Sequence, residues 1–436
     1  MPFSEVGHGD TLRRKRRERT NLLYIIEAAV EYFISILVAG AYLATVTKAL
    51  GVSDALTGIL SAFVSLGQSF QLVALFFARQ KRIKWTVTLM QLINQLCFAA
   101  VFFIPFFQGN VVAKIVVFVV LFLLGHALHN VAYPAKTNWF MSQVDDHNRG
   151  RFTATKEIVS LIGGMIFSLV MSFFMDELKA SGNTQGAFLL CGIGIVALAV
   201  LHACTLIFSH EEKAEEREKI TTVSNMLGGM LKDKNLRKVI FLPVLWHIAH
   251  YVATPFYGSY LIGELGWQLT FVSLLSALSA ITRSSVSHPI GRYADKTSFT
   301  TMLNLCFTIA AAAFFVNIFT TPQTSPVTYT LYTILYAISM AGINSGEINL
   351  IYDFVEPERR VGALALKNFL AGTAGFLTTL LISPLVEFIQ ASGNQLFGIP
   401  VYAQQVMSVI ACVLTVVTIV YLNLVLRKLP REKKEK

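Results

Sequence analysis

The chain has 436 residues, of which 54% are hydrophobic and only 14% charged, and its mean hydropathy is +0.58. One water-soluble core cannot hide that much apolar surface, so the composition excludes an ordinary soluble protein. The net charge of +10 would suggest a nucleic-acid partner in a soluble protein, but the Lys and Arg residues are spread between apolar runs. We therefore expect a lipid bilayer as the main surroundings and no nucleic acid.

Short charged stretches separate apolar runs of about twenty residues, the length that a helix needs to cross roughly 30 Å of hydrocarbon. The basic residues before the first run resemble the start of a signal peptide, but that run reaches about Val46 and has no small-residue cleavage site. The sequence therefore predicts an all-α membrane protein with twelve transmembrane helices. They are expected at 21–47, 55–77, 85–107, 111–134, 157–175, 185–209, 238–262, 269–290, 299–319, 327–351, 368–389 and 402–426.

An even number of spans places both termini on one side of the membrane. Nearly all Lys and Arg residues fall on that side, and Lys48, Lys114 and Lys179 fall on the other. Positive loops stay inside, so both termini are expected in the cytoplasm, and the plasma membrane is the expected location. The five cysteines lie singly within apolar runs, which predicts neither a disulfide nor a metal site.

The sequence repeats itself across a polar stretch at 210–237. Leu50-Gly51 recurs 215 residues later as Leu265-Gly266, and a second set from Asn138 to Gly164 recurs 211 residues later from Asn349 to Gly375. Each repeat holds six spans, so the two halves insert with the same orientation. The expected organisation is a basic N-terminal segment 1–20, a six-helix bundle 21–209, a cytoplasmic linker 210–237, a second bundle 238–426 and a tail 427–436.

A short motif follows the eighth span and consists of Gly291, Arg292, Asp295 and Lys296 with two residues between Arg292 and Asp295. It resembles the G-x-x-x-D-[RK] loop of the major facilitator superfamily (MFS). The resemblance implies two pseudo-symmetric six-helix bundles with the substrate path between them, acting as a monomer. It also implies a gating contact in which Gly291 forms a tight turn and Asp295 faces a helix N-terminus. Arg149 and Arg151 are the expected basic partners of Asp295.

Ionisable residues inside a span cost about 2.5–3.5 kcal/mol or more, so they usually face a cavity or a partner. Glu27 and Glu31 lie four residues apart on the first span and therefore on one helix face. Two neighbouring carboxylates retain a proton more easily, as a proton-coupled carrier requires. The alternative is that both lie at the membrane interface and pair with a basic residue such as Arg19 or Lys136.

Other polar residues lie on spans four, seven, eight and ten, three of which line the central cavity in the family that the chain resembles. Histidine can carry a proton near neutral pH and can hydrogen-bond a polar solute. Arg283 could neutralise an anionic substrate or pair with Glu347. These further candidates for binding substrate or protons are His126, His129, Asn130, His247, His250, Tyr251, Arg283, Asn344 and Glu347.

The sequence contains no G-x-x-x-x-G-K-[ST], HExxH or GxSxG motif, so we expect neither an enzyme nor a cofactor. The predicted function is secondary transport of a small polar organic solute by alternating access, with proton coupling through Glu27, Glu31 or Glu347. Export of amphipathic compounds stays open, although the fifth span lacks the Gly-Pro pair of many drug antiporters. A membrane sensor or scaffold that transports nothing also stays open.

Overall fold

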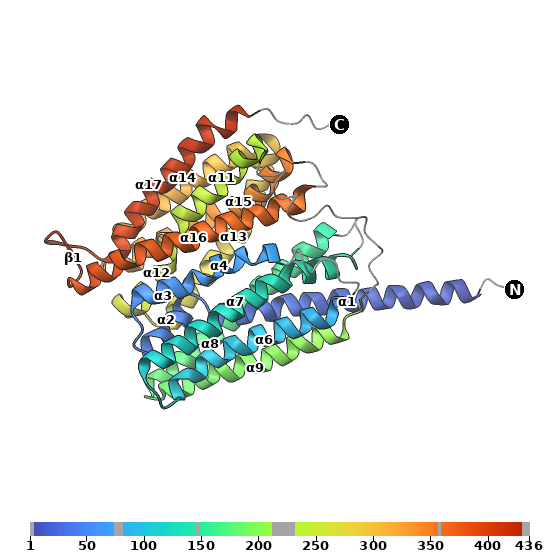
Figure 1. The fold of residues 1–436 in the computed structure, drawn as a ribbon, viewed down its shortest axis with the longest axis horizontal. Coiled ribbons are helices and arrows are strands. Elements are labelled where there is room, and N and C mark those ends of the chain that lie inside the picture. The colour runs from blue at the N-terminus through green and yellow to red at the C-terminus, as the bar shows by residue number, and fades with distance from the viewer. Residues whose placement is uncertain (1–3, 74–81, 145–148, 212–231, 356–358, 430–436) are drawn as a thin grey trace. The chain divides into compact units, whose positions relative to one another are not determined.

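A computed structural model of the chain describes residues 4–73, 82–144, 149–211, 232–355 and 359–429. Within these residues, twelve helical stretches are long and apolar enough to cross a membrane, and each overlaps one predicted span. Apart from one pair of two-residue strands, the regular structure is helical (Figure 1). The predicted all-α fold class is confirmed. Most of the expected linker 210–237 and of the tail 427–436 lies outside the described residues.

The contacts divide the chain into two compact units, and the first consists of residues 1–39 and 73–220. In this unit α6 packs against α7 and α9, while α1 packs against α8 and α9. Two glycines of α8, Gly163 and Gly164, lie against the rings of Phe33 and Tyr32 on α1, where a larger side chain would collide. The helices of the first unit are α1 (Ser4–Leu37), α6 (Lys84–Phe103), η1 (Ile104–Phe106), α7 (Val111–Met141), α8 (Arg149–Ala180) and α9 (Thr184–Phe208).

The second unit consists of residues 40–72 and 221–436. Its first three helices belong to the predicted first bundle by sequence, but they pack on later helices. The helices α2 and α3 contact α12 (Thr254–Ser259), and α3 and α4 contact α16 (Arg360–Ala391). The bundle limits 21–209 and 238–426 therefore remain a prediction of the repeat. The early helices of this unit are α2 (Gly40–Ala49), α3 (Asp54–Ser61) and α4 (Phe63–Ser69).

The later elements of the second unit enclose a large hydrophobic core centred on α11, α14, α15 and α17. A small antiparallel hairpin follows the end of α16 (Figure 1). These elements are α11 (Lys234–Tyr251), α12 (Thr254–Ser259), η3 (Tyr260–Glu264), α13 (Leu269–Lys296), α14 (Phe299–Asn317), α15 (Ser325–Phe354), α16 (Arg360–Ala391), β1 (Gln395–Leu396), β2 (Ile399–Pro400), α17 (Ala403–Leu424) and η5 (Leu426–Lys428).

Three predicted spans are interrupted where the sequence suggested one continuous helix, and in the span 55–77 the interruption lies at Ala62, between α3 and α4. The first, 21–47, ends as α1 at Leu37 and resumes as α2 at Gly40, whose φ is +51°. Gly40 needs to be a glycine because of this positive φ. Gly258 of α12 needs to be one because an added Cβ there would lie 2.6 Å from the backbone of Gly40. The seventh span breaks between α11 and α12, close to the position that the 215-residue repeat makes equivalent to Gly40.

Candidate functional site

A buried ion-pair cluster lies in the first unit, where α1, α7 and α9 meet. Lys136 on α7 is buried, and its Nζ donates hydrogen bonds of 2.6 Å to Oε1 of Glu27 and to Oε1 of Glu31 on α1. Nε2 of the buried His202 on α9 lies 2.8 Å from Oε1 of Glu27, which can only accept when it is ionised. An isolated charge would be very costly here, so these groups stabilise one another.

The cluster has a buried end and an exposed end. The side chains of Glu27 and His202 are 0% exposed, whereas those of Glu31 and His129 are 19% and 29% exposed. Nδ1 of His129 lies 3.2 Å from Oε1 of Glu31. Two atoms at the buried end, Oε2 of Glu27 and Nδ1 of His202, have no hydrogen-bond partner among the described residues. The cluster therefore reaches from the interior of the first unit to accessible surface.

The local sequence explains how the cluster forms. Glu27 and Glu31 are one helical turn apart on α1, so both carboxylates reach the same ammonium. Lys136 belongs to a helix because α7 continues through Pro134 to Met141, beyond the predicted end of the fourth span at residue 134. Proline is tolerated inside a membrane helix when neighbouring groups satisfy the backbone that it frees. Of the basic partners left open for Glu27 and Glu31 by the sequence, the structure shows Lys136.

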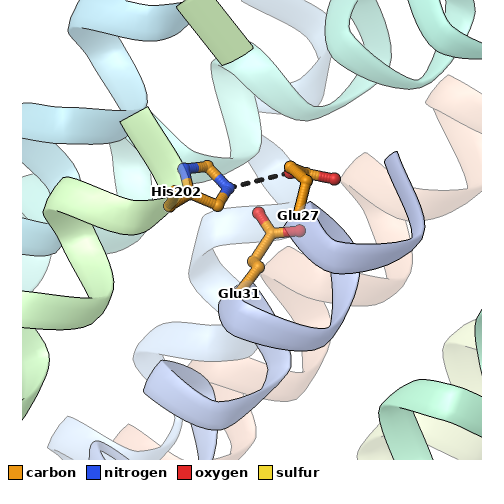
Figure 2. A group of neighbouring side chains, drawn as sticks. All are labelled: Glu27, Glu31 and His202. Atoms are coloured by element: carbon orange, nitrogen blue, oxygen red, sulfur yellow. Dashed lines mark hydrogen bonds and ion pairs between the residues drawn. The ribbon is translucent and has the colours of Figure 1, made fainter. Parts of the chain in front are cut away.

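The same residues raise the question of a metal ion. Figure 2 shows Glu27 and Glu31 on one helix with His202 facing them, and one ligand atom of each lies within 4.8 Å of the others. However, Nζ of Lys136 is 2.6 Å from both carboxylates and already supplies the positive charge there. We interpret the ammonium group of Lys136 as occupying the position that a metal ion would take. The absence of a metal site stays a prediction.

The histidines predicted on span four have different surroundings. His129 joins the cluster, but the ring of His126 packs against Phe98 and Phe122, with centroid distances of 5.0 and 4.7 Å. Nδ2 of Asn130 donates a hydrogen bond of 2.9 Å to the backbone oxygen of His126. The predicted stripe is therefore divided between a polar position at His129 and an aromatic environment at His126.

The candidates on span seven form a polar aromatic group in the second unit. Nδ1 of His250 on α11 contacts the hydroxyl of Tyr336 on α15, and its Nε2 lies 3.1 Å from Oγ1 of Thr254. The ring of His247 stacks on that of Tyr251 with a centroid distance of 5.8 Å. All five side chains are half-buried. This group, which we call the histidine–tyrosine group, offers hydroxyl groups, imidazole nitrogens and ring faces from three helices, α11, α12 and α15.

The predicted pairing of Arg283 with Glu347 is not found. Nζ of Lys367 on α16 donates a hydrogen bond of 3.2 Å to Oε2 of Glu347 on α15, and both residues are buried. Arg283 lies half-buried on α13, and Asn344 is exposed on α15. The pair of Glu347 and Lys367 is electrically neutral when both are ionised.

The gating motif is helical rather than a turn. Gly291 to Lys296 form the last turns of α13, and Gly291 has no positive φ and no atom near the position of an added Cβ. The expected tight turn at Gly291 is wrong, because the helix ends only at Thr297, whose N–H bonds to the oxygens of Tyr293 and Ala294. Arg292, Asp295 and Lys296 are exposed, as is Arg151 on α8. The side chain of Arg149 lies outside the described part, so the gating contact stays a prediction.

Three residues of the ion pairs were not predicted as site residues. Lys136 and Lys367 lie just outside the predicted spans, which end at residue 134 and begin at residue 368, so the span limits place both lysines in loops. His202 lies in the middle of an apolar run, where a lone ionisable residue is itself a signal of a functional or paired position. The repeat held another signal, because its 211-residue offset places Lys367 opposite Lys156 and Glu347 opposite Lys136.

Twelve apolar helical stretches, with ion pairs buried among them, define a membrane protein that spans the bilayer many times. The chain matches the Major Facilitator Superfamily over residues 24–379, and a second match covers residues 239–436. It therefore belongs to this family of membrane transporters. No curated protein matches the chain by sequence.

Solved structures of transporters share its fold. The nucleoside transporter NupG is 15% identical, with 95% of this chain and 100% of that chain covered and a TM-score of 0.66. A D-xylose-proton symporter is 13% identical, with coverages of 93% and 96% and a TM-score of 0.70. The inward open xylose transporter XylE from E. coli is 12% identical, with coverages of 98% and 97% and a TM-score of 0.64. At these identities the likeness shows the fold alone.

Proposed function

We propose that the chain is a proton-coupled secondary transporter that moves a small polar organic solute by alternating access. It acts as a monomer in the plasma membrane with both termini in the cytoplasm, and it needs neither a cofactor nor a nucleic-acid partner. The observation that carries the proposal is the buried cluster of Glu27, Glu31, Lys136 and His202. Alternating access in such transporters is a rocking of one half against the other around a central site.

The proton part of the proposal follows from the composition of the cluster. A purely structural ion pair needs one carboxylate for one ammonium, as Glu347 and Lys367 provide in the second unit. The first unit instead places two carboxylates against the single ammonium of Lys136. One negative charge is in excess when both are ionised, and a buried excess charge favours uptake of a proton.

The solute part of the proposal rests on the histidine–tyrosine group. Tyrosine hydroxyls and imidazole nitrogens donate and accept hydrogen bonds, and their ring faces stack against flat or ring-shaped solutes. A sugar or a nucleoside offers both hydroxyls and a ring, and structures of the same fold include transporters of D-xylose and of nucleosides. We therefore expect a hydroxyl-rich ring compound before a lipophilic cation.

Proton movement in sealed vesicles tests this function. Purified protein in liposomes that contain a pH-sensitive dye is mixed with pentoses, hexoses, nucleosides, organic acids and lipophilic cations in turn. A sugar or nucleoside is expected to change the internal pH, and an ionophore that collapses the proton gradient should abolish its accumulation. A response to lipophilic cations alone would replace the proposal with export of amphipathic compounds. Saturable binding without flux would replace it with a sensor.

A further inference from the structure

The cluster of the first unit contains more acidic groups than its lysine can neutralise, and this excess has a location. We infer that the exchangeable proton is held between Glu31 and His129, at the exposed end of the cluster, while Glu27, Lys136 and His202 form a fixed inner part. The inference rests on the proposed function, because it assigns the position of the coupled proton. The inference gives different roles to Glu27 and Glu31, which the sequence pattern does not distinguish.

The inner part is enclosed: Oε1 of Glu27 lies within hydrogen-bond distance of both Lys136 and His202, while Oε2 of Glu27 has no partner among the described residues. Oε1 of Glu27 accepts from Lys136 at 2.6 Å and lies 2.8 Å from Nε2 of His202, and hydrogen bonds to a carboxylate favour its ionised form. Nδ1 of His202 has no partner among the described residues. A second proton on that imidazole would therefore create a buried donor with nothing to accept it, which is costly. Neither group at this end has an exposed side chain.

The outer part meets both requirements for an exchangeable proton. Nδ1 of His129 lies 3.2 Å from Oε1 of Glu31, so one proton can serve the imidazole and the carboxylate together. Both side chains keep exposed surface, 29% for His129 and 19% for Glu31, so this end of the cluster is not enclosed by the first unit. One proton on this pair makes the whole cluster neutral.

The other charged and titratable groups near Glu31 and His129 are buried or contact other residues, so this pair is the exposed acceptor for a proton. Lys156 of α8 is engaged with Tyr24, whose hydroxyl is 3.2 Å away and whose ring centroid is 4.6 Å away. His126 lies among phenylalanine rings. The groups that face the pair are Tyr24 and Glu27 on α1, His126, Tyr133 and Lys136 on α7, Lys156 on α8 and His202 on α9.

The arrangement also connects the proton to helix packing. Lys136 is shared, at 2.6 Å from each carboxylate, and it is the link between α7 and both turns of α1. Loss of the proton from Glu31 and His129 strengthens the attraction between Lys136 and Glu31, and its return weakens that attraction. Proton exchange at the outer pair therefore changes the force between α1 and α7.

Counting protons without any solute tests this inference. Differential titration of the purified protein between about pH 8 and pH 5, the range in which histidine changes charge, compares each variant with the wild type. Glu31→Gln and His129→Gln are each expected to bind one proton fewer, and the double variant also only one fewer, because the proton is shared. His288, exposed on α13, supplies the control: the changes measured in His129→Gln and in His288→Gln should add in the double variant.

Two results would overturn the inference. One is a loss of two protons in the double variant Glu31→Gln with His129→Gln, because that would mean two independent sites. The other is a loss of a proton in His202→Gln together with no loss in His129→Gln. If Glu31→Gln does not fold, nitrogen-15 NMR of histidine-labelled wild type replaces it: the His129 signal should titrate and the His202 signal should not. A shared proton found together with no pH-driven transport would reject the proposed function and leave this inference standing.

Discussion

Lys136→Met is expected to lower the free energy of unfolding by about 3–5 kcal/mol, because it leaves Glu27 and Glu31 without their ammonium in a buried site. Adding Glu27→Gln should recover more than half of that loss, since the remaining Glu31 keeps His129 beside it. Thermal or denaturant unfolding of the purified protein in one detergent measures both effects. The pattern distinguishes an uncompensated charge from a simple loss of packing.

Lys156→Met is the matched control for this prediction. Lys156 is also a half-buried lysine of the first unit, but its described contacts are the hydroxyl and ring of Tyr24, worth about 1 kcal/mol. It should therefore cost much less than Lys136→Met. Equal losses in the two variants, or no recovery with Glu27→Gln, would show that the cluster does not depend on its ammonium.

Gly372→Val is expected to separate α4 from α16 in the second unit. An added side chain at Gly372 would collide with the backbone oxygen of Ser65, whose own hydroxyl donates a hydrogen bond of 2.9 Å to the oxygen of Gly372. Overpacking of this kind costs about 1–3 kcal/mol when it is relieved by movement. The contact is therefore expected to open rather than to absorb the new methyl groups.

Cross-linking measures this separation. The hydroxyl oxygens of Ser69 and Thr373 lie 2.9 Å apart, so cysteines at these two positions in a background without the native cysteines should form a disulfide readily. Gly372→Val should reduce its yield several-fold. Gly291→Val is the control, because an added Cβ at that helical glycine meets nothing within 4 Å. An unchanged yield in Gly372→Val would mean that the close approach of α4 and α16 is not required.

The spans could be predicted because they depend on local composition, which the sequence displays directly. Their ends and breaks depend on single residues whose effect is decided by neighbours. Gly40 has a positive φ of +51° where the first span breaks, whereas Pro134 does not end the fourth. Gly291 allows a turn but stays helical, since the helix continues to Lys296. Glycine and proline therefore indicate where a helix is able to break, but the neighbouring helices decide where it does.

Half of the site could also be predicted. The four-residue spacing of Glu27 and Glu31 placed both carboxylates on one face. Lys136 and His202 are 109 and 175 residues from Glu27 along the chain, so only the packing of α1, α7 and α9 reveals them as partners. The repeat contains part of this information, because it aligns Lys136 with Glu347, two residues of opposite charge. Each of them pairs with a residue of another helix, Lys136 with Glu27 and Glu347 with Lys367.

In the proposed function, proton movement through the Glu27, Glu31 and Lys136 cluster drives solute transport. The most direct test compares wild type and Glu31→Gln in liposomes, using a solute found by the vesicle screen. Two rates are measured: accumulation driven by a pH gradient, and exchange of labelled for unlabelled solute at equal pH. Glu31→Gln is expected to keep exchange and to lose accumulation. Accumulation at the wild-type level in that variant would contradict the proposed function.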